Sequence, residues 1–182
     1  MDQPSYCIDV RGILDEHGGI VSVDAQVPVP AITLGTETYD TVGPAHLVAT
    51  LTNTGAGVVL SGEAQLAVIA TCSRCLEPFE LSVTGEVEGF YVHHGHERDL
   101  PEEQEFAFIT EGSVDVMEPL LGAVALAIPF APVHAEDCAG ICVTCGADLS
   151  VGSCACAPDL SRSPFVALKD LLPPSGQEGG QE

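Results

Sequence analysis

Cysteine is the residue type in this chain that points most directly to chemistry. Five of the eight cysteines lie within residues 137–156. A Cys-x-x-Cys-Gly turn brings two of them together, and a Cys-x-Cys pair follows eight residues later. Four thiolates so close in the chain can surround one tetrahedral Zn²⁺, and the glycine, Gly146, tolerates the positive φ that such a turn needs. The spacing predicts a closed structural zinc site with four ligands: Cys142, Cys145, Cys154 and Cys156.

A second pair, Cys72 and Cys75, has the same spacing but lacks the following glycine. It either stands alone or shares a site with the late cluster, and the shared site would use Cys72, Cys75, Cys142 and Cys145. Disulfides and inert core residues are the alternatives to metal binding. The first ten residues contain no basic region, apolar run or cleavage signal, which predicts a cytoplasmic protein with reduced thiols and favours a metal.

The residues around the second pair suggest how it could behave. Arg74 lies between Cys72 and Cys75, and a cation there could lower the pKa of the thiols and make them reactive. The simpler interpretation is that Arg74 faces solvent or meets Glu77 or Glu80. We therefore expect Arg74 to lie at the surface.

Three further residues or clusters could act as metal ligands, but each has a simpler interpretation. Residues 93–96 contain three histidines, and no spacing fixes their geometry, so we predict a solvated loop. His134 could add a ligand to the late cluster, although it is more simply a bystander. Cys7 lies in an apolar setting and is expected to be a buried strand residue.

The elements that position these residues follow from hydrophobic periodicity. Apolar and polar residues alternate over 45–52, 58–70 and 80–92, and the Asn-Thr-Gly-Ala-Gly stretch at 53–57 separates the first two runs. This pattern predicts an antiparallel meander with one solvated face, in which the Cys72–Cys75 turn joins two strands. Shorter strands are expected at 7–10, 20–23, 31–34 and 106–109.

Two helices are expected in the second half of the chain. Apolar residues recur at helical spacing over 113–129, with Ser113 as the cap. Residues 119–133 carry no charge, but fifteen residues are too few to span a membrane, so this is a core helix. A short amphipathic helix is expected at 163–172, followed by a disordered tail at 173–182.

These elements predict the α+β class: an antiparallel sheet that could be barrel-like, one buried helix, a zinc-type loop and a short C-terminal helix. We expect one domain over 1–172. It comprises a β-rich front at 1–110, the helix at 113–129, the cysteine loop at 137–156 and the C-terminal helix at 163–172.

Composition limits the possible partners. The 182 residues contain 27 Asp and Glu against 5 Lys and Arg, for a net charge of −22. Affinity for the phosphate backbone comes from cations that displace counterions, so direct RNA or DNA binding should be weak. A basic protein is the more suitable partner, although acidity could also serve solubility alone.

The combination of motifs resembles the YceD family, bacterial proteins associated with accumulation of the large-subunit ribosomal RNA. The similarity rests on the order of five segments: 72–79 (Cys-Ser-Arg-Cys-Leu-Glu-Pro-Phe), 114–116 (Val-Asp-Val), 126–129 (Leu-Ala-Ile-Pro), 137–149 and 154–156. The resemblance implies a non-catalytic factor in ribosome assembly. It would act with the pre-ribosomal large subunit or with a basic RNA-binding protein, and not with DNA or a membrane.

Two other classes of protein use similar cysteines. A thiol-disulfide oxidoreductase would use Cys72 and Cys75, but thioredoxin-like sites lie at a helix N-terminus after a strand, not between two strands. A metal-responsive regulator would need a nucleic-acid-reading helix or an open metal site, and neither is visible. No catalytic triad and no glycine-rich phosphate loop is present in the sequence.

Overall fold

The computed structural model describes residues 4–101 and 103–156. The chain divides into two compact units, Met1–Cys138 and Ala139–Glu182, and each is described by itself. The single domain over 1–172 stays a prediction. The predicted helix at 163–172 and the predicted tail at 173–182 lie outside the described residues.

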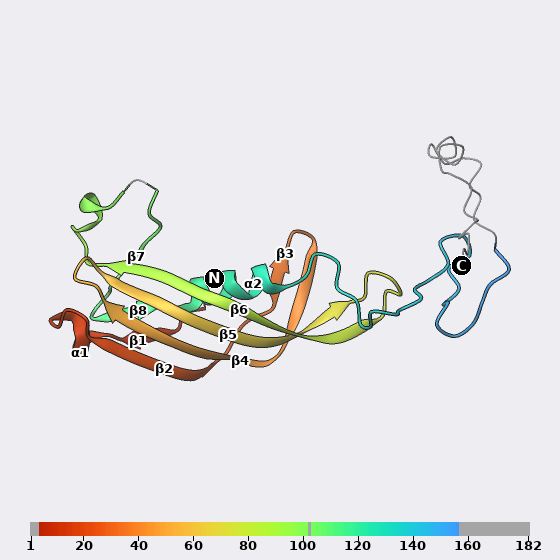
Figure 1. Ribbon diagram of the computed structural model, residues 1–182, viewed down its shortest axis with the longest axis horizontal. Helices are drawn as coiled ribbons and strands as arrows, with labels where there is room; N and C mark the ends of the chain where they lie inside the picture. Colours follow the sequence, from red (N-terminus) through yellow and green to blue (C-terminus); the bar gives the residue numbers. More distant parts are fainter. Residues whose placement is uncertain (1–3, 102, 157–182) are drawn as a thin grey trace, which may run out of the picture. The chain divides into compact units, whose positions relative to one another are not determined.

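The first unit is built on a mainly antiparallel sheet with the strand order β2-β4-β5-β6-β7 (Figure 1). A further short strand, β3, also pairs with β4. A separate two-stranded sheet pairs β1 with β8. The strands are β1 Cys7–Asp9, β2 Ile20–Val27, β3 Ile32–Leu34, β4 Glu37–Asn53, β5 Val58–Thr71, β6 Pro78–Val92, β7 Ala107–Phe108 and β8 Ser113–Asp115. The helices are α1 Arg11–Leu14, the 3₁₀ helix η1 Glu97–Asp99 and α2 Met117–Ala127. None of the helices that the structure describes is long and apolar enough to cross a membrane.

The sheet is open, so the predicted barrel-like closure is wrong for the part of the chain that the structure describes. β2 pairs only with β4, and β7 pairs only with β6. Two prolines, Pro28 and Pro30, follow β2 and interrupt further pairing along that edge. At the other edge, β7 covers only Tyr91 and Val92 of β6. Neither edge strand therefore provides the continuous pairing that closure requires.

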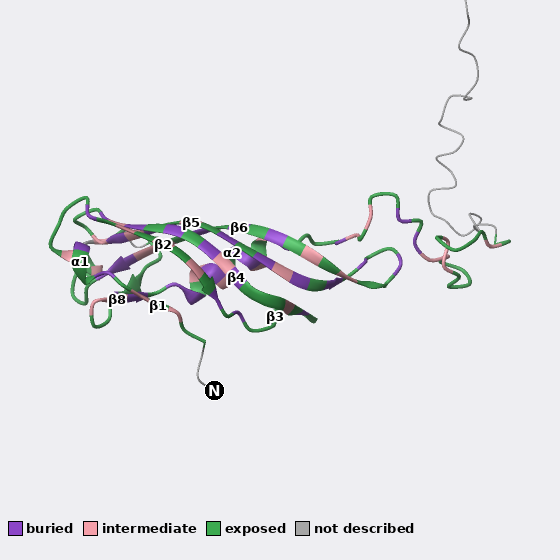
Figure 2. Ribbon diagram, turned by 90° about the horizontal axis from the view of Figure 1, so that it is seen from below, coloured by how far each residue is buried: buried purple, intermediate pink, exposed green. Residues whose placement is uncertain are grey.

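Alternation places one face of the long strands in the core. Leu47 and Leu51 of β4 are buried together with Leu60 and Leu66 of β5. Their neighbours in the sequence face solvent, and Figure 2 shows buried and exposed residues alternating along these strands. The expected meander is confirmed, since β4 pairs antiparallel with β5 and β5 with β6.

Helix α2 covers part of the buried face, and a glycine lets it come very close to β6. A Cβ atom added at Gly85 of β6 would overlap the carbonyl oxygen of Ala123 in α2. The backbones of helix and strand can therefore touch only because residue 85 has no side chain. The contact fixes α2 along β6.

Helix α2 begins at Met117 and not at Ser113 as the sequence predicted. Residues 113–115 form β8 instead, where Val114 pairs with Ile8 of β1. The Oδ1 atom of Asp115 accepts hydrogen bonds from the backbone N–H groups of Met117 and Tyr6, each at 2.9 Å. This carboxylate accepts the N–H of the first residue of α2 and ties the start of the helix to the residue that precedes β1. The helix ends before Ile128, whose extended backbone is the conformation that a following proline favours.

Candidate metal centres

The structure gathers four possible metal ligands in the first unit, which we call the Cys/His group: Cys72, Cys75, His134 and Cys138. The first two lie on the turn between β5 and β6, and the other two follow α2. The four ligand atoms all lie within 4.8 Å of one another. The sulfurs of Cys72 and Cys138 are 3.9 Å apart, and the sulfur of Cys75 is 3.4 Å from Nδ1 of His134. The first distance is far beyond the ~2.05 Å of a disulfide.

A second set of ligand atoms lies in the second unit, and we call it the all-cysteine group: Cys142, Cys145, Cys154 and Cys156. Its four sulfurs also lie within 4.8 Å of one another. A small hairpin-like turn positions the first pair, since Ile141 bridges to Asp148 and the N–H of Leu149 donates to the carbonyl of Gly140 at 2.9 Å. The residues that spacing predicted as one site thus converge.

The alternative set that the sequence suggested combined the two Cys-x-x-Cys pairs. Each pair instead finds two further ligands within its own unit. Sequence reasoning missed His134 and Cys138 as neighbours of Cys72 and Cys75. The signal that could have found them is the His-x-x-x-Cys spacing, which resembles the second half of many zinc sites. Cysteine and histidine are ligands that Zn²⁺ accepts, so both groups could hold a metal ion.

The two Cys-x-x-Cys turns have the same backbone. In the first, the N–H of Leu76 donates to the carbonyl of Cys72 at 2.9 Å, and in the second the N–H of Gly146 donates to the carbonyl of Cys142 at 2.8 Å. The residue after the second cysteine has positive φ in both turns, 64° for Leu76 and 72° for Gly146. The first turn therefore forms without the glycine that the second one has.

Local hydrogen bonds separate the pKa values of the thiols in the Cys/His group. Burial alone would raise the pKa of Cys72, but the backbone amides of Cys75, His134 and Arg74 and the side chain of His134 lower it to about 5. The backbone amide of Glu77 lowers the pKa of Cys75, but burial and the neighbouring sulfurs of Cys72 and Cys138 raise it to about 11. As pH rises, Cys72 therefore ionises well below the pH at which Cys75 does.

The all-cysteine group shows the same separation. The backbone amides of Cys145 and Thr144 lower the pKa of Cys142 to about 6, with help from the sulfurs of Cys154 and Cys145. The N–H of Thr144 lies 3.4 Å from the Cys142 sulfur. The sulfur of Cys145 has the largest effect on Cys156 and, with burial, raises its pKa to about 11. Amide donors that stabilise a thiolate are also suited to a thiolate bound to a metal.

Arg74 is exposed, which confirms the expected surface position, although its hydrogen bonds go to neither Glu77 nor Glu80. Its Nη1 atom donates to the carbonyl oxygens of Glu136 at 2.8 Å and Cys138 at 3.1 Å. The guanidinium group thus braces the backbone beside the Cys/His group. The effect of this residue on the pKa of Cys72 comes from its backbone amide.

The other candidate ligands lie elsewhere. His93, His94 and His96 are exposed, which confirms the predicted solvated loop, and the ring of His94 stacks on Phe108 with centroids 4.0 Å apart. Cys7 is exposed, so its predicted burial is wrong. In the short strand β1 it is Ile8 that turns toward the core, and its two neighbours face outward.

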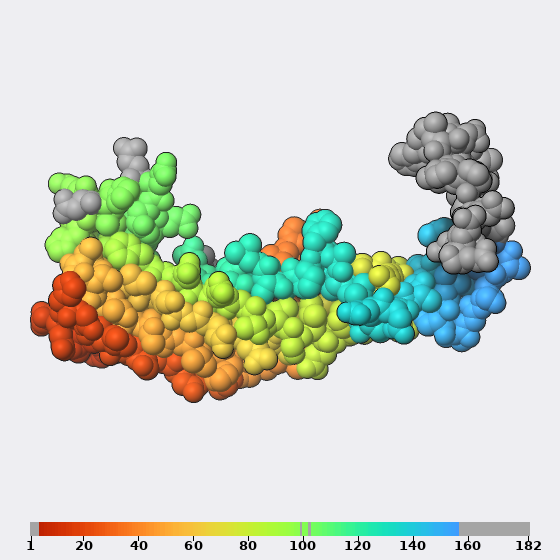
Figure 3. All heavy atoms as spheres, in the orientation of Figure 1, coloured from red at the N-terminus to blue at the C-terminus, as the bar shows by residue number. Residues whose placement is uncertain are grey.

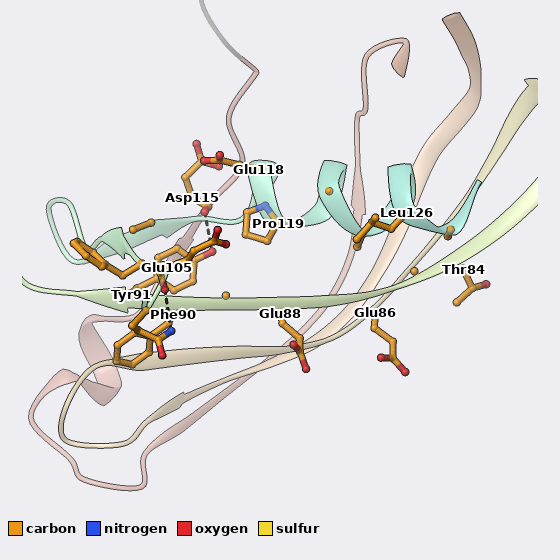
Figure 4. Close-up of a pocket in the computed structure, with 18 residues that line it drawn as sticks. Thr84, Glu86, Glu88, Phe90, Tyr91, Glu105, Asp115, Glu118, Pro119 and Leu126 are labelled. Atoms are coloured by element: carbon orange, nitrogen blue, oxygen red, sulfur yellow. Dashed lines mark hydrogen bonds between the residues drawn. The ribbon is translucent and has the colours of Figure 1, made fainter. Parts of the chain in front are cut away.

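An acidic groove of about 1120 Å³ runs along β6 in the first unit, between this strand, residues 104–107 and α2. In Figure 3 the surface dips between the segment around 93–108 and α2. Its acidic residues are Glu86, Glu88, Glu105, Asp115 and Glu118. Figure 4 shows Glu105, Asp115 and Glu118 on the same side of β6 as α2, and Glu86 and Glu88 on the other side.

The groove also has apolar walls and a buried tyrosine at one end. The hydroxyl group of Tyr91 donates to the carbonyl of Asp115 at 2.9 Å (Figure 4). Burial, and then the charges of Asp115 and Glu118, raise the pKa of Tyr91, so this hydroxyl stays neutral. Phe106 and Leu126 line the groove and are exposed, Leu126 by 90%. The groove therefore combines negative charge with exposed apolar surface.

Residues 60–172 match the family described as "Large ribosomal RNA subunit accumulation protein YceD". The chain belongs to the YceD family. Uncharacterized proteins of Mycobacterium bovis and Mycobacterium tuberculosis are each 30% identical to it over 95 residues, which cover 52% of this chain and 46% of theirs. The matched segment thus spans about half the length of these relatives. An uncharacterized protein of Mycobacterium leprae is 25% identical over 145 residues, 79% of this chain and 67% of that protein. No solved structure matches the chain.

The region that matches the YceD family contains every residue of the Cys/His group, the all-cysteine group and the acidic groove. Strands β1 to β4 precede it, and β2, β3 and β4 complete the sheet on which β5 and β6 lie. Both candidate metal sites and the acidic groove therefore lie in the region that the family shares.

Proposed function

We propose that this chain is a non-catalytic factor that supports accumulation of large-subunit ribosomal RNA during ribosome assembly in the cytoplasm. The observation that supports this most is the match of residues 60–172 to the YceD family. The description of the family names accumulation of an RNA and no reaction. The mycobacterial relatives are uncharacterized, so they add no activity of their own to this argument.

The factor reaches RNA through a basic protein, either an RNA-binding protein or a component of the pre-ribosomal large subunit. A net charge of −22 repels phosphate and attracts cations. The acidic groove suits an extended basic segment, because β7 covers only the end of β6 and leaves the rest of that edge without a strand partner among the described residues. A segment laid there would meet carboxylates on both sides and apolar surface at Phe106 and Leu126.

The all-cysteine group binds one Zn²⁺ in this proposal, with Cys142, Cys145, Cys154 and Cys156 as its ligands. Four sulfurs within 4.8 Å of one another leave no open coordination position, which favours a structural role over catalysis. Zinc would stabilise the second unit by joining the Cys-x-x-Cys turn to the Cys-x-Cys pair.

The competing function is thiol-disulfide exchange at Cys72 and Cys75. The low pKa of Cys72 favours it, because the thiolate is the nucleophile in such exchange. The exposed fraction of Cys72 is 0%, however, and an attacking sulfur must be reached by the partner disulfide. A structural role for the pair is therefore the better interpretation.

Depletion of the protein in the cell that makes it tests the proposed function. The ratio of large- to small-subunit ribosomal RNA should fall, precursors should accumulate, and the protein should co-sediment with pre-ribosomal particles. Complementation with the Cys72→Ser/Cys75→Ser variant should restore function only as far as this variant folds. Unchanged RNA ratios, together with dithiol turnover by the pure protein, would replace the proposal with the oxidoreductase.

A further inference from the structure

We infer that the Cys/His group is a second, structural zinc site, with Cys72, Cys75, His134 and Cys138 as ligands. It is separate from the zinc proposed for the all-cysteine group. The inference goes beyond the proposed function and does not rest on it. The site would fasten the turn between β5 and β6 to the chain that follows α2.

The ligand distances match a tetrahedral zinc ion. Zn–S bonds of about 2.3 Å at tetrahedral angles place two sulfurs about 3.8 Å apart, and a Zn–N bond of about 2.05 Å places nitrogen and sulfur about 3.6 Å apart. The corresponding distances are 3.9 Å between Cys72 and Cys138 and 3.4 Å between Cys75 and His134. One central ion accounts for both pairs.

Burial indicates that the site is closed. Cys72, Cys75 and Cys138 are buried and form a small cluster of their own, with Phe79 and Val133 packed against it. Only His134 reaches the surface. A buried site with four protein ligands has no position for a substrate, so the ion would serve the fold.

Three hydrogen bonds hold the two ligand segments together around the group. The N–H of Ser73 donates to the carbonyl of Pro132 at 2.8 Å, and Arg74 donates to the carbonyls of Glu136 and Cys138. These partners lie 59 or more residues apart in the chain. Such outer contacts orient the ligands of a metal site and keep the segments in place while the ion binds.

Metal analysis of the 182-residue chain, purified without chelator, tests the inference. The wild type should contain about two equivalents of zinc. His134→Ala should contain about one, and since His134 is exposed this change leaves no buried cavity. His134→Cys supplies a fourth sulfur and should restore the second equivalent. The matched control, His93→Ala, changes an exposed histidine outside both groups and should keep two equivalents.

Further variants distinguish loss of zinc from the Cys/His group from loss of zinc from the all-cysteine group. Cys154→Ser should also contain about one equivalent, and Cys154→Ser/His134→Ala close to none. With Co²⁺ as the probe, sulfur-to-cobalt charge-transfer absorption should be weaker for the ion in Cys154→Ser, with three thiolates, than for the ion in His134→Ala, with four. Full zinc content in His134→Ala with circular dichroism like that of the wild type would overturn the inference.

Trypsin provides a second readout, because the few basic residues leave few cleavage sites and Arg74 lies inside the metal turn. Removal of zinc should raise cleavage after Arg74 at least about tenfold, since local opening exposes the bond. Cleavage after Arg98, in η1, should stay the same and serves as the internal control. Equal cleavage after Arg74 with and without zinc would contradict the fastening role.

Discussion

At the scale of single residues, Leu76 shows how strongly the turn of the Cys/His group is imposed on the chain. Its φ of 64° lies in the left-handed region, which costs a residue with a Cβ atom about 1–2 kcal/mol. Its side chain is 61% exposed, so burial of the leucine does not offset this cost. The equivalent position in the all-cysteine group is Gly146, where the same conformation carries no such cost. Strain of this kind persists where surrounding contacts determine the backbone, here the ligands of the group.

Leu76→Gly should therefore stabilise the protein. We expect the free energy of unfolding to rise by about 0.5–1 kcal/mol, because the relief of left-handed strain exceeds the added freedom of the unfolded chain. Zinc content should not change. Leu76→Val should lower stability, since a β-branched residue tolerates positive φ least. Urea unfolding of the three proteins measures this, and a loss of stability in Leu76→Gly would contradict the account of strain.

The candidate ligands were predictable only in part, for a reason that is clear at this scale. Cys142, Cys145, Cys154 and Cys156 are near one another in the sequence, so spacing alone brings them together. Cys75 and His134 are 59 residues apart, and Cys72 and Cys138 are 66 apart. Spacing along the chain cannot show which distant segments meet, because that depends on how α2 packs on the sheet.

At the scale of elements, the long strands were predictable and the ends of helices were not. Alternation identified β5 and β6 because one face of each is buried over many residues. Helix α2 was predicted too long, since the pairing of Val114 with Ile8 is a tertiary contact that overrides local helical periodicity. The short helix α1 was not predicted. The amide group of Asn53, at the end of β4, donates to the carbonyls of Ile13 and Leu14 and holds α1 in place.

Because α2 lies so close to β6, we expect alanine substitutions at two glycines to change stability in opposite directions. Gly85→Ala should lower the free energy of unfolding by about 2–3 kcal/mol, because its Cβ would overlap the Ala123 carbonyl and force the helix away. Gly122 lies in α2, and a Cβ added there would meet no atom within 4 Å, so Gly122→Ala should raise stability by about 0.5–1 kcal/mol. Thermal or urea unfolding measures both changes, and equal effects of the two substitutions would show that helix and strand do not touch as described.

At the scale of the whole molecule, charge decides which partners the protein can meet. The structure describes three of the five basic residues, Arg11, Arg74 and Arg98. Arg11 pairs with Asp9, and Arg74 is bound to backbone carbonyls. The described residues thus contain no cluster of cations able to follow a phosphate backbone, while the acidic groove concentrates carboxylates along β6 in the first unit.

The same groove predicts how a basic segment should bind. An arginine-rich peptide should bind the 182-residue chain with an affinity that falls as salt rises. Glu105→Gln/Glu118→Gln removes two charges from the groove and should weaken binding several-fold. The matched control, Glu16→Gln/Glu37→Gln, removes two exposed charges outside it and should have a smaller effect. Equal losses in the two double variants would mean that net charge alone attracts the peptide.

Binding of ribosomal RNA, in contrast, should be weak and should depend little on salt concentration. Each phosphate that a protein neutralises releases counterions, so a strong RNA binder loses affinity steeply as salt rises, with a slope of log K against log salt of about −0.7 per phosphate contact for single strands. With five basic residues in a chain of net charge −22, we expect weak binding and a slope near zero. Fluorescence anisotropy with a labelled fragment of large-subunit RNA, over a range of salt concentrations, measures both quantities. Tight binding that collapses between low and moderate salt would mean that the protein contacts RNA directly, and the need for a basic partner would disappear.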